Sequence, residues 1–266
     1  MRKLGISYNA FDGLELLEGS LEITTCVVDY VSVVWQPVSN FGKKISENDS
    51  DIISDLKRKY PGVRFISYMP ACHGGHVNEL KKRNLGLELS KLNGCTHHMS
   101  MDVDEYYDTH ELADAINDVV LGGFDSSACQ MQTYWKDDTH RLKVPEEYYV
   151  PLVYKIDGRK FDSRVTWPVL VDPTRRLQPG KTMLFDRSSV EMHHMSYVRA
   201  DIRSKLENSS ASINFASRID NLVSAYDNWS PGDPAVFAGA EERVYELCET
   251  ESRFGIKRTM EKWKRA

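Results

Sequence analysis

Short apolar segments alternate with amphipathic ones through the first hundred residues. Runs rich in apolar or β-branched residues predict strands at about 3–8, 27–35, 64–69 and 96–102. Between them, apolar positions at helical spacing predict helices at about 14–23, 50–60 and 76–92. Strands that alternate with helices are typical of a parallel sheet, whose ligands bind beyond the carboxyl ends of the strands. We therefore predict an α/β fold with its ligand site at that edge.

The rest of the chain continues this pattern less regularly. A helix is predicted at about 110–121 and strands at about 128–135, 150–156 and 189–194, with loops rich in Gly, Pro and Arg over 157–181. Further helices are predicted at about 197–206, 213–226 and 234–248. Together these elements indicate a single doubly wound α/β domain with a mostly parallel central sheet, followed by a C-terminal helical extension.

The composition is that of a water-soluble protein, with 41% hydrophobic and 27% charged residues among 266. No apolar run approaches the length that crosses a bilayer, and the N-terminus leads directly into a predicted strand. We expect a cytoplasmic protein without a signal peptide or membrane contact.

Five scattered cysteines without a Cys-x-x-Cys pair indicate reduced, mostly buried thiols rather than disulfides or a zinc site; they are Cys26, Cys72, Cys95, Cys129 and Cys248.

Charge is divided unevenly along the chain. Residues 1–150 hold 15 Lys and Arg against 23 Asp and Glu, a net charge of −8, whereas residues 151–266 hold 19 against 16, a net charge of +3. The last fourteen residues contain six basic side chains and one acidic one. This basic end fits either a solvated helix or a surface for a polyanion such as nucleic acid. The net charge of −5 for the whole chain argues against a dedicated nucleic-acid binder.

Three acids follow the fourth predicted strand: Asp102, Asp104 and Glu105. Because strand side chains alternate between faces, Asp102 and Asp104 project to the same side, about 7 Å apart. Two carboxylates so close repel each other unless a cation lies beside them. A hard divalent ion such as Mg²⁺ or Mn²⁺, which also binds diphosphate oxygens and water, fits this arrangement. A solvated acidic loop is the alternative interpretation of the same residues.

Two adjacent histidines, His193 and His194, end a predicted strand about ninety residues later. An imidazole there can complete a metal site held by carboxylates, and strand alternation allows only one of the two rings to reach it. A purely structural role for both rings is the alternative. The similar pair at 97–98 lies inside a predicted strand and is interpreted as core. The chain has neither a Gly-x-Gly-x-x-Gly turn nor a P-loop, so neither of those nucleotide-binding folds is supported.

Several of these features occur together in a known order. Asn9 follows the first strand, a helix carries Lys82-Arg83-Asn84-Leu85-Gly86-Leu87, Asn93-Gly94 forms a turn, and the next strand ends in Asp102-Val103-Asp104. In this order and spacing, residues 3–107 resemble the nucleotide-sugar half of GT-A glycosyltransferases, in which a later histidine often completes the metal site. The resemblance implies a GT-A fold with 1–107 as the donor half, 108–212 as the acceptor half, and 213–266 as a helical extension.

The resemblance also implies roles for individual residues. Asp104 would bind Mn²⁺ or Mg²⁺ on the diphosphate of a nucleotide sugar, expected to be UDP-linked, together with His193 or His194. Asp102 would contact the ribose, or the metal through water. The metal would neutralise the leaving diphosphate while the sugar passes to an acceptor hydroxyl. Further donor contacts are expected from Tyr8, Asn9, Gln36, Arg83 and Asn84, with Lys181, Arg199 and Lys205 as additional cations.

The chain departs from many inverting members of the family, because it lacks their Glu-Asp pair and their Gln-x-x-Arg-Trp helix start. Without that base, and with a C-terminal histidine as metal ligand, retention of the anomeric configuration is expected. Asp138, in the pair Asp137-Asp138, is the candidate acid on the acceptor side. An exposed turn explains that pair equally well.

Residues 7–17 and 193–211 also resemble small glycosyltransferases of tailed phages, some of which modify hydroxymethylated or already glucosylated bases in DNA. A DNA acceptor is therefore one expectation, and the basic second half agrees with it. A saccharide or a lipid-linked acceptor is another. A sugar-nucleotide nucleotidyltransferase shares the sheet and the acids, but it normally has a glycine-rich loop where this chain has Phe11-Asp12-Gly13. A non-catalytic module that binds nucleotides or polyanions is the remaining interpretation.

Overall fold

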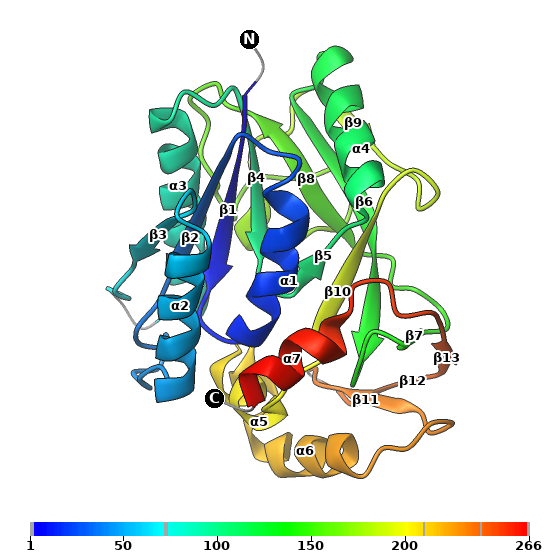
Figure 1. The fold of residues 1–266 in the computed structure, drawn as a ribbon. Helices are drawn as coiled ribbons and strands as arrows, with labels where there is room; N and C mark the ends of the chain where they lie inside the picture. The colour runs from blue at the N-terminus through cyan, green and yellow to red at the C-terminus, as the bar shows by residue number, and fades with distance from the viewer. Residues whose placement is uncertain (1–2, 72–73, 210, 240, 265–266) are drawn as a thin grey trace.

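A parallel four-stranded sheet forms the first half of the molecule (Figure 1). The computed structural model describes residues 3–71, 74–209, 211–239 and 241–264. The strands lie in the order β3-β2-β1-β4, and Asn9 of β1 is in register with Asp102 of β4. These strands and the helices that join them are β1 (Leu4–Ala10), α1 (Leu14–Thr24), β2 (Tyr30–Trp35), α2 (Glu47–Lys59), β3 (Arg64–Ser67), α3 (Gly75–Leu92) and β4 (His97–Asp102).

Helices cover both faces of this sheet, because successive side chains of β1 point to opposite sides. Ser7 lies against Gly86 of α3, whereas the hydroxyl of Tyr8 is 2.8 Å from two hydroxyl groups of α1. The helices α2 and α4 (Thr109–Leu121) share the main hydrophobic core with α1. On the other face, Leu87 of α3 packs with apolar residues of the segment 161–177. The molecule therefore has three layers, with the sheet in the middle.

The second half of the sheet mixes parallel and antiparallel strands. It contains β5 (Glu105–Tyr106), β6 (Ser126–Trp135), β7 (His140–Leu142), β8 (Tyr149–Lys155), β9 (Thr182–Leu184) and β10 (Glu191–Tyr197). The strand β8 runs antiparallel to both β4 and β6 and joins the two halves. β10 runs parallel to β6 and antiparallel to β5, so the carboxyl half of β10 lies beside the acidic turn after β4.

The C-terminal part combines helices with short strands. It comprises α5 (Ile202–Asn208), the 3₁₀ turns Ser212–Asn214 and Ala216–Arg218, α6 (Ile219–Asp227), β11 (Ala235–Phe237), β12 (Arg243–Tyr245), β13 (Leu247–Glu249) and α7 (Ile256–Lys264). The prediction of a helix at 234–248 was wrong, since β11 pairs with β12 and β13 pairs with β7 in this part of the chain. Phe237 packs against Trp135 and Tyr197, and this aromatic cluster favours the extended chain.

The boundary between β10 and α5 also differs from the prediction. The strand continues to Tyr197, and the helix begins only at Ile202. The carboxylate of Asp201 accepts a hydrogen bond from the backbone N–H of Ser204 at 3.0 Å, which caps the new helix. Residues 198–201 are thereby left as a connection between the two elements, and Arg199 lies within it.

The predicted α/β domain with a mostly parallel central sheet is confirmed. In the described part of the chain, no helix is both long and apolar enough to cross a membrane. Cys95 and Cys129 are buried free thiols, Cys248 is half-buried, and Cys26 is exposed. Cys72 lies outside the described residues.

Candidate active site

A polar cleft of about 270 Å³ opens at the carboxyl ends of β1, β2 and β4. It lies where a parallel α/β sheet binds its ligands. Residues from α3, β10 and α5 also line it, so the cleft brings together segments that are far apart in sequence. Among the residues predicted for the site, the cleft is lined by Asn9, Gln36, Arg83, Asp102, Asp104, His194, Arg199 and Lys205.

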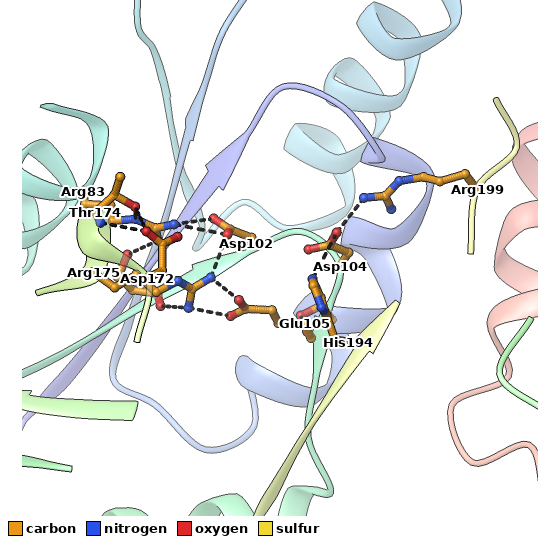
Figure 2. Close-up of polar contacts among 11 residues, drawn as sticks. Arg83, Asp102, Asp104, Glu105, Asp172, Thr174, Arg175, His194 and Arg199 are labelled. Atoms are coloured by element: carbon orange, nitrogen blue, oxygen red, sulfur yellow. Dashed lines mark hydrogen bonds and ion pairs between the residues drawn. The ribbon is translucent and has the colours of Figure 1, made fainter. Parts of the chain in front are cut away.

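Asp102, the last residue of β4, is held by two arginines. Nη2 of Arg83 lies 3.2 and 3.1 Å from its two carboxylate oxygens, and Nη2 of Arg175 donates to Oδ2 at 2.6 Å (Figure 2). Arg175 also donates to both carboxylate oxygens of Glu105. Burial acts to raise the pKa of Asp102, but the two guanidinium groups outweigh it and hold that pKa well below its usual range. Asp102 is therefore a fixed carboxylate that is poorly suited to accept a proton.

Asp104 follows in the turn between β4 and β5. Its Oδ2 accepts a hydrogen bond from Nη2 of Arg199 at 2.5 Å and lies 3.8 Å from Nε2 of His194 (Figure 2). Burial acts to raise the pKa of Asp104, but Arg199 and His194 outweigh it and lower that pKa. The carbonyl oxygen of Asp104 accepts from the backbone N–H of Met195 at 2.8 Å. This backbone hydrogen bond fixes β10 against the acidic turn.

The two neighbouring histidines point to opposite sides of β10, as strand alternation requires. His194 reaches the cleft, and its side chain is 26% exposed. Burial lowers the pKa of His194 although Asp104 acts against it, so the ring is mainly neutral near pH 7. His193 is buried, with Nδ1 2.9 Å from the hydroxyl of Tyr134. Burial, assisted by Arg253, lowers the pKa of His193 to about 4.

Tyr8 and Asn84 do not line the cleft. The ring of Tyr8 is fully buried beneath α1. The side-chain amide of Asn84 donates to the carbonyl oxygen of Phe161 at 3.0 Å and accepts from its N–H at 2.9 Å. Asn84 thus attaches the segment around Phe161 to α3, in a role that supports the surroundings of the cleft.

Asp138 and Lys181 also lie outside the cleft. The carboxylate of Asp138 is buried and accepts from the hydroxyl of Ser252 at 2.6 Å and from the N–H of Phe254 at 3.3 Å. It joins the turn after β6 to the C-terminal segment. Lys181 donates to the carbonyl oxygen of Gly122 at 2.8 Å, near β9.

The cleft contains further charged residues, of which Lys205 was expected as an additional cation and Lys82 was not singled out as a site residue. Lys82 lies one position before Arg83 on α3, and burial lowers its pKa to about 8. Lys205 of α5 donates to the hydroxyl of Ser196 at 2.7 Å, and burial, with Arg199 acting in the same direction, lowers its pKa to about 8. Asp12, Glu79 and Asp172 complete the charged lining. A cation beside a helix motif is a usable sequence signal for Lys82, whereas Arg175, which pairs with Asp102, ends the short 3₁₀ helix Pro173–Arg175 in a segment without periodicity.

Asp104 and His194 offer an oxygen and a neutral nitrogen to a metal ion. Among the described residues, no group of three or more His, Cys, Asp or Glu side chains is arranged to hold a metal alone. An ion bound by this pair would therefore need oxygens from phosphate or water to complete its coordination. An imidazole suits Mn²⁺ better than Mg²⁺, which strongly prefers oxygen ligands. The donor pair fits a metal that is shared with a diphosphate.

No protein-family model and no curated protein matches the chain. Similar solved structures include TarS 1-349 of S. aureus, with 11% identity and a TM-score of 0.46 over 77% of this chain and 63% of that one. The mannosyltransferase PcManGT from Pyrobaculum calidifontis, in complex with GDP-Man and Mn²⁺, has 10% identity and a TM-score of 0.46 over 83% and 65% of the two chains. This chain therefore spans less than two thirds of either protein. Likeness at this level assigns neither a family nor an activity.

Proposed function

We propose that this protein is a metal-dependent glycosyltransferase that moves a sugar from a nucleotide-sugar donor, expected to be UDP-linked, to an acceptor hydroxyl. The observation that carries the proposal is the approach of Asp104 and His194 to 3.8 Å in a cleft at the carboxyl edge of a parallel sheet. Lys82, Arg199 and Lys205 add positive charge to the same cleft. Carboxylate, imidazole and several cations together suit a metal-bound diphosphate.

In this proposal the donor lies along the cleft from β2 and β1 towards β4. The amide of Asn9 is buried and has no hydrogen-bond partner among the described residues, so it is available to the nucleoside, beside Gln36. Asp104 and His194 would hold Mn²⁺, which supplies charge neutralisation for the leaving diphosphate. Arg83 fixes the orientation of Asp102 for contact with the ribose.

The proposal includes retention of anomeric configuration. Both Asp102 and Asp104 have lowered pKa values, and a carboxylate of low pKa is a weak general base. Direct activation of an acceptor hydroxyl by either residue is therefore disfavoured. The anomeric configuration of the product, measured by NMR, checks this part of the proposal.

The proposed acceptor is a hydroxymethylated or already glucosylated base in phage DNA, and the proposed location is the cytoplasm. Support comes from the phage-like segments 7–17 and 193–211 and from the net charge of +3 over residues 151–266. We further propose residues 1–107 as the donor half, 108–212 as the acceptor half and 213–266 as an extension. Transfer assays on such DNA, with simple saccharides in parallel, distinguish a DNA acceptor from a saccharide acceptor.

The decisive variant is Asp104→Asn, which keeps the size of the side chain and removes its charge. We expect no detectable transfer from UDP-sugars with Mn²⁺ and at least about tenfold weaker binding of UDP and Mn²⁺. Asp51→Asn, at an exposed position of α2, is the matched control and should leave both unchanged. Full activity of Asp104→Asn contradicts the proposal. Release of pyrophosphate from a nucleoside triphosphate and a sugar phosphate would instead identify a nucleotidyltransferase.

A further inference from the structure

The guanidinium of Arg199 forms a hydrogen bond with the same carboxylate oxygen of Asp104 that lies nearest to His194. Its Nη2 donates to Oδ2 of Asp104 at 2.5 Å, and the same oxygen lies 3.8 Å from Nε2 of His194 (Figure 2). The side chains of Arg199 and Asp104 are only 4% and 9% exposed. Breaking a buried ion pair is costly unless both partners gain new ones. A metal ion at Asp104 therefore has to compete with Arg199.

The backbone at Gly13 leaves space for the guanidinium of Arg199. A Cβ atom on Gly13 would lie 2.6 Å from Nη1 and 2.7 Å from Cζ of Arg199. Gly13 precedes α1 with φ of 76°, a conformation that glycine adopts readily and other residues adopt rarely. The hydroxyl of Tyr226 contacts the backbone N–H and carbonyl oxygen of Arg199, each at 3.4 Å. The guanidinium thus lies in a space formed for it between α1 and the acidic turn.

Most of the hydrogen-bonding capacity of this guanidinium is unused. Nε and Nη1 of Arg199 are buried without a hydrogen-bond partner in the described part of the chain. Unpaired buried donors are unfavourable, and a guanidinium carries five N–H groups in a fork that matches phosphate oxygens. A second cation, Lys205, lines the same cleft. Neighbouring cations with free donors fit an anion that has several oxygens, such as a diphosphate.

We propose that Arg199 alternates between Asp104 and the diphosphate of the donor. Without metal, Arg199 neutralises Asp104. When Asp104 and His194 take up a divalent cation, Arg199 leaves Oδ2 and donates to the phosphate oxygens instead. This inference rests on the proposed function, because it requires a metal and a diphosphate in the same cleft.

The alternation makes the binding of metal and the binding of diphosphate depend on each other. A metal ion alone would take away the hydrogen-bonded partner of Arg199 and leave it only the electrostatic attraction of Asp12 and Glu15, so the metal ion binds weakly. A diphosphate gives the released guanidinium a partner, so UDP and metal strengthen each other's binding by the same factor. Couplings between two binding sites are typically about 5- to 150-fold. Arg199 would carry most of this coupling.

The experiment measures the dissociation constant of Mn²⁺ by calorimetry or electron paramagnetic resonance, with and without UDP. In the wild type, we expect UDP to tighten Mn²⁺ binding by at least about fivefold. In Arg199→Gln, Mn²⁺ alone should bind more tightly than in the wild type, and UDP should tighten it less than about twofold. Mn²⁺ alone should also raise the melting temperature more in this variant than in the wild type.

Arg203→Gln is the matched control, since it removes the same charge from an exposed arginine that pairs with Asp220 on the surface. It should leave both constants unchanged. If Arg199→Gln does not fold, Arg199→Lys serves instead, because it keeps the charge but lacks the forked guanidinium. UDP should tighten Mn²⁺ binding to Arg199→Lys by less than in the wild type but by more than the twofold limit given for Arg199→Gln. Equal coupling in the wild type and in either Arg199 variant overturns this inference alone. Failure of the wild type to bind Mn²⁺ and UDP overturns the proposed function as well.

Discussion

His193 and His194 are adjacent in the chain, but His194 lines the cleft whereas His193 is buried. We therefore expect substitutions at the two residues to have different effects. His194→Ala removes the imidazole nearest to Asp104, so we expect Mn²⁺ affinity in the presence of UDP to fall by at least about tenfold. His193→Phe leaves the buried hydroxyl of Tyr134 without this hydrogen-bond partner, so it should cost about 1–3 kcal/mol of stability and leave Mn²⁺ affinity unchanged. Calorimetric titration of both variants checks the pair, and a loss of Mn²⁺ affinity in His193→Phe would contradict the assignment of His194.

At this scale, the sequence predicted residues whose chemistry depends on position along a strand. Asp102, Asp104 and one histidine of the 193–194 pair line one cleft. Alternation along β10 accounts for the histidine, whereas Asp104 lies in the turn after β4 and not on the strand. Arg175 was not predicted as a site residue, although it pairs with Asp102 and Glu105. It ends the three-residue 3₁₀ helix Pro173–Arg175, which is too short to show periodicity, and its partners are about seventy residues away in the chain. Contacts of that kind depend on tertiary packing, which residue spacing does not encode.

At the scale of elements, the approach of α3 to β1 depends on Gly86. A Cβ atom there would lie 2.0 Å from Oγ and 2.3 Å from Cβ of Ser7, and the latter atom cannot rotate away. We expect Gly86→Ala to destabilise the protein by about 1–3 kcal/mol, despite the better helix propensity of alanine. Because α3 also carries Arg83, UDP binding should weaken as well. Chemical denaturation with a UDP titration measures both effects.

The control for this prediction is a compensating change on β1. Ser7→Gly removes the atoms that clash, so the double variant Ser7→Gly/Gly86→Ala should recover stability relative to Gly86→Ala alone. If the double variant is no more stable than the single one, then the close approach of α3 and β1 is not the cause of the loss.

Elements with strong periodicity were predicted well, and those with short or mixed patterns were not. The helix α3 lies within one residue of its predicted range, because apolar residues recur along its whole length. The segment 234–248 was predicted as a helix but forms β11, β12 and most of β13. Each of these strands has only three residues, and each is stabilised by a partner strand or the aromatic cluster around Phe237. A local pattern cannot reveal such partners.

At the scale of the whole molecule, two buried neutral histidines make stability depend on pH. Burial lowers the pKa of His98 to about 3 and that of His193 to about 4. Above about pH 6.5 both rings are neutral in the folded and the unfolded chain and contribute no pH dependence. As the pH falls from about 6.5 towards these folded pKa values, only the unfolded chain takes up the proton. The free energy of unfolding should therefore fall, by up to about 1.4 kcal/mol per pH unit for each ring.

His98→Gln tests this dependence, because it removes the ring of His98 and keeps a side chain that can bond to Ser90. Between about pH 6 and 4, urea denaturation should show a slope smaller than that of the wild type by about 1.4 kcal/mol per pH unit. An unchanged slope would show that His98 is not the buried neutral base described here.

The hydrogen bond from Met195 to the carbonyl oxygen of Asp104 joins positions about ninety residues apart, and this separation has a consequence for biosynthesis. Ribosomes deliver the N-terminal strands first, and contacts that close long loops form late because their entropic cost comes before their stabilisation. A nascent chain that has exposed residues 1–104 already contains Asp102 and Asp104 but not His194. Under the proposed function, binding of the cation therefore requires that β10 has left the exit tunnel and paired with β5, so we expect fragments released before that point to be inactive towards a nucleotide-sugar donor.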